Sequence, residues 1–331
     1  MKRHRGLIET RATIMEFQEM RALRENSELL HKSAVEAEND RRRDLVKQWL
    51  LGFCNENELE RNLRVRVVAS GSGRWLLEKS IFRGWFSPNL CSAPLLWLTG
   101  IPGAGKILRQ GPCLLSEWYM REGLTLPKGK TVLASVVIDE LIKLAETTKM
   151  TVAYFYCKYG DERRNSFLAV ARSLLSQLQI KASGDLISYM YEKATTSSGV
   201  HLTSTSTAKE ILKLLIGDCR TIGPVYLVID GIDECGREDR KEIANWFQSV
   251  SDSLPVDEKD RFRCLFVSQD DGIGRKDFKE VPTIKITPDD NRKDIEFFAA
   301  VWHKTLEAKF GELRSSNEQI TNIVTARAGG M

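Results

Sequence analysis

Apolar residues follow two patterns beyond residue 94. Short and nearly continuous apolar runs have the length and composition of buried parallel strands. They occupy residues 95–99, 151–159, 224–230, 262–268 and 283–287. Between them lie stretches with apolar residues at helical spacing: 131–146, which lacks Gly and Pro, and a helix near 208–219 that follows a polar loop at 195–207. This alternation predicts an α/β fold, a parallel sheet flanked by helices on both faces.

The first part of the chain has a different pattern. Residues 7–60 are rich in Glu, Arg, Leu and Ala and contain no Pro, which predicts helix, but their apolar residues keep no strict heptad. We therefore assign residues 1–68 to a helical N-terminal prefix that could pair with a partner. Residues 69–94 change to Gly, Ser, Pro and aromatics, which indicates a linker into the core domain at 95–331.

Composition narrows the class of protein only a little. The chain has 331 residues, 42% of them hydrophobic, and a net charge of +4, which argues neither for nor against an acidic partner. Basic clusters at 2–5 and 41–43 are expected to be solvated helix faces more readily than nucleic-acid or membrane contacts. Seven Cys without C-x-x-C spacing predict reduced thiols. No apolar run reaches the length of a membrane span, and the prediction is a cytoplasmic protein.

The candidate chemistry begins with a divided phosphate-binding loop. A P-loop needs Gly, four residues, and then Gly-Lys followed by Ser or Thr: the glycines let backbone N–H groups surround the phosphates, Lys reaches the β/γ-phosphates, and the hydroxyl ligates Mg²⁺. Residues 100–106 read GIPGAGK, but Ile107 replaces the hydroxyl residue. Gly129-Lys130-Thr131 supplies the hydroxyl, but Leu124 replaces its first glycine. The candidate nucleotide-binding residues are Gly100, Gly103, Gly105, Lys106, Gly129, Lys130 and Thr131.

The residues that follow each half of the loop show which half can lead into a helix. A P-loop must lead directly into a helix, whose N-terminal amides bind phosphate. Gly111-Pro112 would stop a helix soon after Lys106, whereas 131–146 can form one. Removing 106–129 would leave a complete loop with its helix. The residues at both ends of this segment permit splice-site codons, so we expect a retained intron; a genuine insertion loop is the alternative.

A second constellation follows the strand expected at 224–230. A buried strand that delivers a carboxylate at its C-terminal end is the Walker B arrangement: Asp230 would hold Mg²⁺ together with Thr131, and Asp233 or Glu234 would orient the attacking water. Acidic residues commonly follow buried strands, so the run is weak evidence alone. Its presence together with the glycine loop favours a nucleotide site over two unrelated loops.

The strand expected at 262–268 would lie beside the first strand and end near the γ-phosphate. Ser268 or Gln269 could then sense phosphate by hydrogen bonding; the alternative is an ordinary exit from a strand. Trp75, Trp85 and Phe86 could cover a base, but core packing is the better interpretation.

These residues together resemble fungal NACHT-type proteins of the STAND class of P-loop NTPases, the group with vegetative-incompatibility proteins and nephrocystin-like N-terminal domains. The similarity covers roughly 45–331 and includes PLLWLTGIPGAGK, TVLASVVIDEL and VYLVIDGIDEC. It implies an ATP or GTP switch with Mg²⁺, slow hydrolysis, homo-oligomerisation on activation and an effector that binds the N-terminal helical region. It also implies that Lys130 and Thr131 take the P-loop roles in an uninterrupted chain. Lys106 would take the lysine role only in the chain as printed. By the same resemblance, a C-terminal arm and ligand-sensing repeats are missing here.

Three functions are compatible with these motifs. The first is a signalling NTPase in self/non-self recognition or immunity-like signalling. The second is a scaffold that has lost nucleotide binding because its P-loop is interrupted. The third, a nucleic-acid-linked ATPase, rests on the basic clusters alone, since no recognition motif accompanies them. The sequence does not choose between ATP and GTP.

Overall fold

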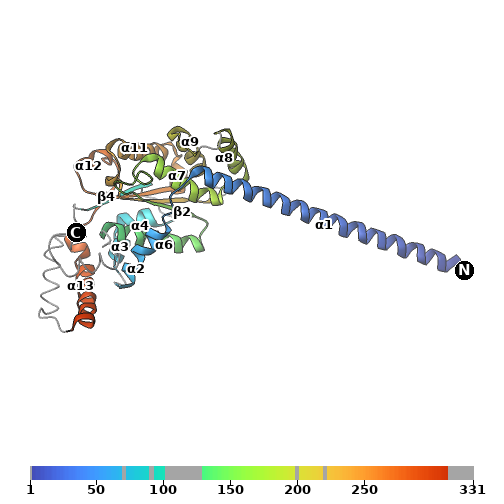
Figure 1. Cartoon of the computed structure of the whole chain (residues 1–331), viewed down its shortest axis with the longest axis horizontal. Coiled ribbons are helices and arrows are strands. Elements are labelled where there is room, and N and C mark those ends of the chain that lie inside the picture. Colours follow the sequence, from blue (N-terminus) through green and yellow to red (C-terminus); the bar gives the residue numbers. More distant parts are fainter. Residues whose placement is uncertain are drawn as a thin grey trace.

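A five-stranded parallel sheet forms the centre of the protein in the computed structural model (Figure 1). The structure describes residues 2–68, 72–88, 93–100, 129–197, 201–218 and 222–311. The strands are β1 Leu95–Gly100, β2 Thr151–Tyr156, β3 Val225–Asp230, β4 Phe262–Gln269 and β5 Thr283–Lys285. All five coincide with predicted runs, although β2 ends three residues earlier than expected. The predicted α/β fold is confirmed.

The order of the strands is β2-β3-β4-β1-β5. β4 pairs with β1 on one side, where Gly100 faces Gln269, and with β3 on the other, where Asp230 faces Val267. The strand predicted to lie beside the first strand therefore does so. Because all strands are parallel, the residues that follow β1, β3 and β4 meet at one carboxyl edge, where open α/β sheets bind ligands.

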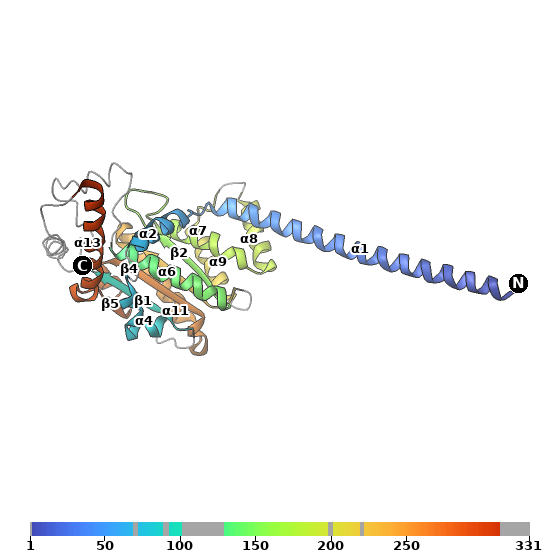
Figure 2. The ribbon, with the colours of Figure 1, turned by 90° about the horizontal axis from the view of Figure 1, so that it is seen from below.

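Helices cover both faces of the sheet, as Figures 1 and 2 show. The helices are α2 Glu56–Val68, α3 Arg74–Glu78, α4 Ser80–Phe86, α6 Gly129–Thr147, α7 Phe167–Leu178, α8 Gly184–Thr196, α9 Thr205–Gly217, α11 Arg237–Ser253, α12 Gly274–Asp277 and α13 Pro288–Phe310. Leu96 and Leu98 of β1 pack under α6, whereas Leu95 and Trp97 pack on the side of α7, α9 and α11. The strand period of two thus divides the core into two layers.

The long first helix, α1 Lys2–Leu50, has a free part and a packed part. Its outer part projects from the body in Figure 1, and Leu23 and Leu30 are 68% and 70% exposed. At its inner end Val46, Trp49 and Leu50 are buried in the core cluster, where α1 contacts α7 and α8. The inner third of the predicted prefix is therefore part of the packed body.

Arginines at the inner end of α1 bind protein groups. Arg43 donates to the carbonyl oxygens of Gln179 and Ala182 at 2.6 and 2.8 Å. Arg42 pairs with Glu38 at 3.0 Å. Two residues of the basic cluster at 41–43 thus have structural roles, which weakens the case for a nucleic-acid contact.

The segment expected to be a linker is folded where the structure describes it. α3 and α4 bury Leu76, Phe82 and Trp85 against the α6 side of the sheet. The Trp85 ring lies edge-on to Tyr226 with centroids 5.8 Å apart, so its predicted core packing is confirmed. Buried Arg263 of β4 donates to the carbonyl oxygens of Trp85 and Ser87.

Within the described ranges, no helix is long and apolar enough to cross a membrane. The cysteines described there are Cys54, Cys157, Cys235 and Cys264, and all four are free thiols. No group of three or more potential metal ligands occurs in the same part of the chain. The reduced state predicted for the cysteines therefore agrees with these four.

Candidate functional site

The start of α6 lies against the end of β1. α6 begins at Gly129, so Lys130 and Thr131 belong to its first turn. Lys130 is buried, 7% exposed, and its Nζ lies 3.5 Å from the carbonyl oxygen of Gly100. A Cβ at Gly100 would lie 3.6 Å from Cδ of Lys130 and 3.4 Å from Ile286. The second Gly-Lys-Thr is thus beside the strand that carries the first glycine.

Three predicted site residues, Gly103, Gly105 and Lys106, lie outside the described residues. The described half has the features of an anion site: the first-turn N–H groups of α6 have no partner within the helix, and the helix dipole is positive at this end. Thr131 is half-buried there, and its carbonyl oxygen accepts from the Ser135 hydroxyl at 2.8 Å.

The predicted Walker B residues leave the neighbouring β3 in a tight turn. Asp230 is the last residue of β3 and is 5% exposed. Gly231 has φ +75°, and a Cβ there would lie 3.1 Å from the carbonyl oxygen of Cys157. Only glycine adopts this left-handed conformation readily in so little space. The turn leads into a 3₁₀ segment, Ile232–Glu234, which carries the two remaining carboxylates.

Those two carboxylates have different surroundings. Asp233 Oδ1 accepts a hydrogen bond from the backbone N–H of Gln269 at 3.1 Å. Burial raises the pKa of Asp233, the backbone hydrogen bond and the charge of Lys130 oppose that rise, and Glu234 adds to it. Glu234 Oε2 accepts instead from the backbone N–H of Tyr159 at 3.0 Å. Asp233 is therefore held against the end of β4 within the field of Lys130, whereas Glu234 is held by the segment that follows β2.

The two candidate phosphate sensors at the end of β4 lie on opposite faces. Ser268 is buried, accepts a hydrogen bond from the Trp97 indole at 2.8 Å and donates to the Gln269 carbonyl at 3.1 Å. Its side chain belongs to the layer of α7 and α11. Gln269, one residue further, alternates to the α6 side and is half-buried.

The structure thus brings Gly100, Lys130, Asp230, Asp233 and Gln269 to one edge and one face of the sheet. It also adds residues that the sequence patterns did not single out. The Tyr156 hydroxyl, at the end of β2, lies 2.8 Å from the Ser135 hydroxyl of α6, and burial raises the pKa of Tyr156. Arg164 donates to the Tyr156 carbonyl at 3.0 Å and pairs with Glu58 of α2 at 3.3 Å. The only sequence signal for Tyr156 is its place at the end of a strand.

Several solved structures are similar to this chain at low identity. The ORC2 protein of Aeropyrum pernix, in ADPNP-ADP complexes, is 12% identical with a TM-score of 0.38, and 77% of this chain covers 65% of that chain. The Walker-type ATPase PABY2304 of Pyrococcus abyssi is 13% identical with a TM-score of 0.40, and the match covers 77% of this chain and 64% of that chain. PCH-2 of C. elegans is 11% identical with a TM-score of 0.30, covering 86% and 72%. The chain thus spans slightly less than two thirds of the first two.

No curated protein matches the sequence. A family model, Nephrocystin 3, N-terminal, matches residues 71–108 and 127–269, more than half of the chain. The match includes both P-loop halves, the Walker B strand and β4, and it omits 109–126. By this match, the chain belongs to the Nephrocystin 3, N-terminal family.

Proposed function

We propose that the protein is a nucleotide-dependent switch of the P-loop NTPase class that binds ATP or GTP with Mg²⁺. The observation that supports it is the position of Lys130: it lies in the first turn of α6, beside Gly100 and within the field of Asp233. A buried lysine next to carboxylates at a helix N-terminus is an arrangement that binds a nucleoside triphosphate.

The candidate site residues that the structure describes have the following roles in this proposal. Lys130 and the first-turn N–H groups of α6 bind the β- and γ-phosphates, and Thr131 and Asp230 hold the metal. When bound, Mg²⁺ neutralises charge on the phosphates. Asp233 or Glu234 orients and deprotonates the attacking water, and the raised pKa of Asp233 suits a proton acceptor. Gln269 is the better sensor candidate, because the Ser268 hydroxyl bonds Trp97 on the opposite face.

Residues 106–129 are an interruption in this proposal, most simply a translated intron. Two observations support it: α6 begins at the second Gly-Lys-Thr, and the family match omits 109–126, which lie inside this segment. An insert within the loop would disturb the arrangement of N–H groups that the loop provides. Sequencing the cDNA across residues 100–135 tests the intron, which is excluded if the mature message retains the segment and the gene lacks splice signals at its ends.

Calorimetric titration of Mg-ATP and Mg-GTP tests the nucleotide site. The printed chain should bind weakly or not at all, and a chain lacking 106–129 should bind in the micromolar range. In that shortened chain Lys130→Ala should abolish binding, whereas Lys143→Ala should not, because Lys143 lies on the exposed side of the same helix. Equal micromolar affinity for both chain lengths would refute the interruption, and binding that survives Lys130→Ala would refute the site.

The signalling role is a proposal that rests on the family resemblance and on α1. The outer part of α1 carries Leu23 and Leu30 far from the body, where an effector protein could bind them. Nucleotide-driven self-association is the expected output. Light scattering of the shortened chain with ADP and with a non-hydrolysable ATP analogue tests it; an unchanged monomer in both would contradict oligomerisation.

A second candidate is a scaffold without nucleotide binding. The observation that favours it is the 24-residue segment 106–129, which separates the two halves of the loop. If neither the printed nor the shortened chain binds nucleotide, this is the function that the fold supports.

A further inference from the structure

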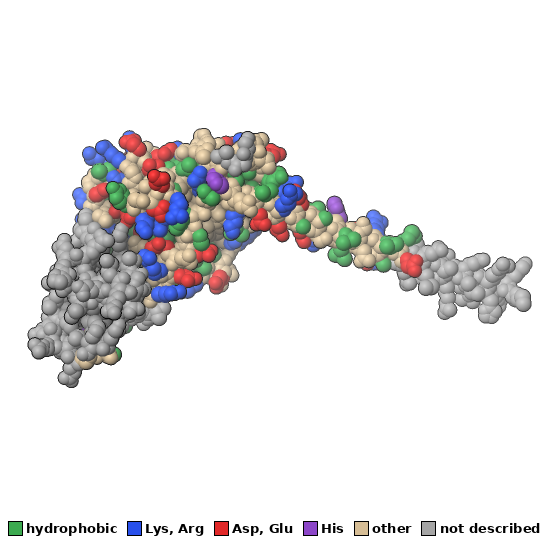
Figure 3. Space-filling view, in the orientation of Figure 1, with side chains coloured by type: hydrophobic (Ala, Val, Ile, Leu, Met, Phe, Trp, Pro, Cys, Tyr) green, Lys and Arg blue, Asp and Glu red, His purple; other side chains and the backbone are tan. Residues whose placement is uncertain are grey.

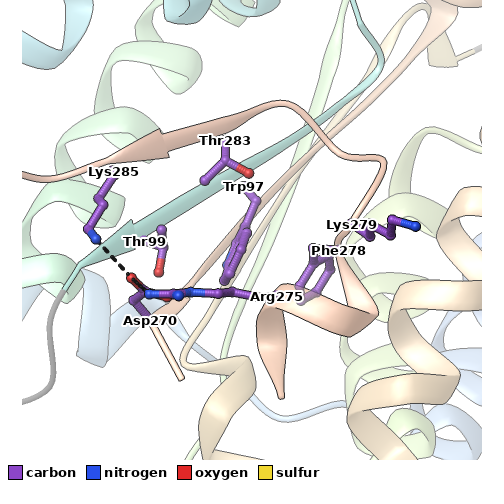
Figure 4. A pocket seen from close by; sticks show the side chains of 8 residues that line it. All are labelled: Trp97, Thr99, Asp270, Arg275, Phe278, Lys279, Thr283 and Lys285. Atoms are coloured by element: carbon purple, nitrogen blue, oxygen red, sulfur yellow. Dashed lines mark hydrogen bonds and ion pairs between the residues drawn. The ribbon is translucent and has the colours of Figure 1, made fainter. Parts of the chain in front are cut away.

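A cavity of about 380 Å³ opens on the face of the sheet opposite α6. Figure 4 shows it between β1, β5 and α12, with Lys285 and Thr283 on β5, Thr99 on β1, and Asp270 directly after β4. Trp97 and Phe278 form its inner wall, with ring centroids 5.2 Å apart. This volume lies within the range of small-molecule sites.

Charge in the cavity is arranged around one carboxylate. Arg275 binds Asp270 through Nε and Nη2 at 2.7 and 2.8 Å, and Lys285 Nζ lies 3.2 Å from the same carboxylate. A guanidinium has five N–H groups and an ammonium three, so Asp270 leaves most of these donors available. Lys279 also lines the cavity, but in Figure 4 its ammonium points away from the Asp270–Arg275 pair. Arg275 and Lys285 together with Asp270 leave an excess of one positive charge.

The floor of the cavity holds an unused hydrogen-bonding group. Thr99 is 2% exposed, and among the described residues no partner reaches its hydroxyl. In Figure 4 this hydroxyl points toward the Asp270–Arg275 pair. Burying a hydroxyl without a hydrogen-bond partner is unfavourable. The burial of the Thr99 hydroxyl is therefore more easily explained if a ligand or a water molecule forms a hydrogen bond with it.

We propose that this cavity is a second anion site, which binds the phosphate of a small phosphomonoester or of inorganic phosphate through Arg275, Lys285 and the Thr99 hydroxyl. The three phosphate oxygens offer more acceptors to the remaining N–H groups of Arg275 and Lys285 and to the Thr99 hydroxyl than the two oxygens of a carboxylate do. Asp270 is the positioning residue, because it holds the guanidinium and the ammonium side by side. The site does not rest on the proposed nucleotide function, since Lys130 lies on the other face of β1.

Calorimetric titration of the full chain with phenyl phosphate, inorganic phosphate and benzoate tests the proposal. One phosphate should bind per chain in the sub-millimolar range, and benzoate should bind about tenfold more weakly. Tighter binding of phenyl phosphate than of inorganic phosphate would identify an organic phosphomonoester as the ligand, and equal binding would identify free phosphate. No phosphate binding, or benzoate binding as tightly, would overturn the site; with no binding of either, water alone completes Thr99.

Variants separate this cavity from the nucleotide site. Arg275→Gln should weaken phosphate binding at least about tenfold, whereas Lys276→Gln, an equal loss of charge on an exposed neighbour, should leave it unchanged. Thr99→Val should weaken binding about fivefold without lowering the melting temperature, because it removes an unpartnered group. Lys130→Ala should have no effect. Phosphate binding that is lost in Lys130→Ala and kept in Arg275→Gln would overturn the cavity site and leave the nucleotide proposal intact.

Discussion

The two faces of the sheet differ at its carboxyl edge. On the α6 face, the last residues of β1, β3 and β4 are Gly100, Asp230 and Gln269, which meet the start of a helix and carry the candidate nucleotide chemistry. On the opposite face, Trp97 and Ser268 bond each other and close the core. Neighbouring residues of one strand therefore have different roles, because successive side chains point to opposite faces of the sheet.

The largest expected effect is at the α6 face, in the chain that lacks 106–129. Asp230→Ala should weaken Mg²⁺-dependent nucleotide binding by about 100-fold, because it removes a metal-holding carboxylate. Glu234→Gln should keep binding and slow hydrolysis by about 100-fold, the size of a typical general-base contribution. Nucleotide titration and single-turnover hydrolysis separate the two effects.

Asp233→Asn is the matched comparison for this pair. If Asp233→Asn slows hydrolysis while Glu234→Gln hydrolyses as fast as its parent, the water-orienting role belongs to Asp233. If all three variants bind and hydrolyse normally, the α6 face does not carry the chemistry at all.

A paired substitution at the end of β4 compares the faces directly. Ser268→Ala should lower the free energy of unfolding by about 1–3 kcal/mol, since it leaves the buried Trp97 N–H without an acceptor, and should leave nucleotide affinity unchanged. Gln269→Ala should change stability by less than about 0.5 kcal/mol and slow hydrolysis about tenfold. Urea unfolding and hydrolysis assays measure both. The reverse pattern would mean that Ser268 is the sensor.

The smallest expected effect concerns Asp270 and depends on pH. Hydrogen bonds from Arg275, and then from Lys285, lower the pKa of Asp270 from 3.8 to about 2. A lowered pKa means that the ionised carboxylate stabilises the folded state above about pH 4, and that this stabilisation is lost as pH falls from about 4 to 2. Since both cations are more than half exposed, Asp270→Asn should cost below about 1 kcal/mol at pH 7.

Urea unfolding of Asp270→Asn and its parent between pH 7 and 3 measures this difference. The gap should narrow toward the acid end, and Asp252→Asn on the exposed surface of α11 should show no comparable gap. A gap that widens as pH falls would contradict the ion-pair origin.

The sequence was sufficient for the sheet and for the carboxyl edge with the candidate site, because buried parallel strands are mostly apolar and because β1 and β3 end in Gly100 and Asp230. The faces could not be predicted in the same way. Apart from Arg263, residues 262–267 of β4 are apolar on both sides, so nothing in FRCLFVSQ indicates that Gln269 and not Ser268 faces α6. Residues 69–94 looked like a linker because α3 and α4 are too short to show helical periodicity. Which part of α1 packs depends on contacts with α7 and α8, which lie more than 100 residues away.

The projecting part of α1 also affects how the molecule moves in solution. Between Lys2 and Asp40 the helix rises about 58 Å, close to three times the radius of gyration of about 20 Å expected for a compact chain of this length. Figure 3 shows apolar and charged side chains interspersed along the part of this helix that it draws in colour. An arm of this length increases hydrodynamic drag, so the monomer should elute from a sizing column ahead of globular proteins of equal mass. Its tumbling should be anisotropic: slow about axes perpendicular to the arm and faster about the long axis of the arm.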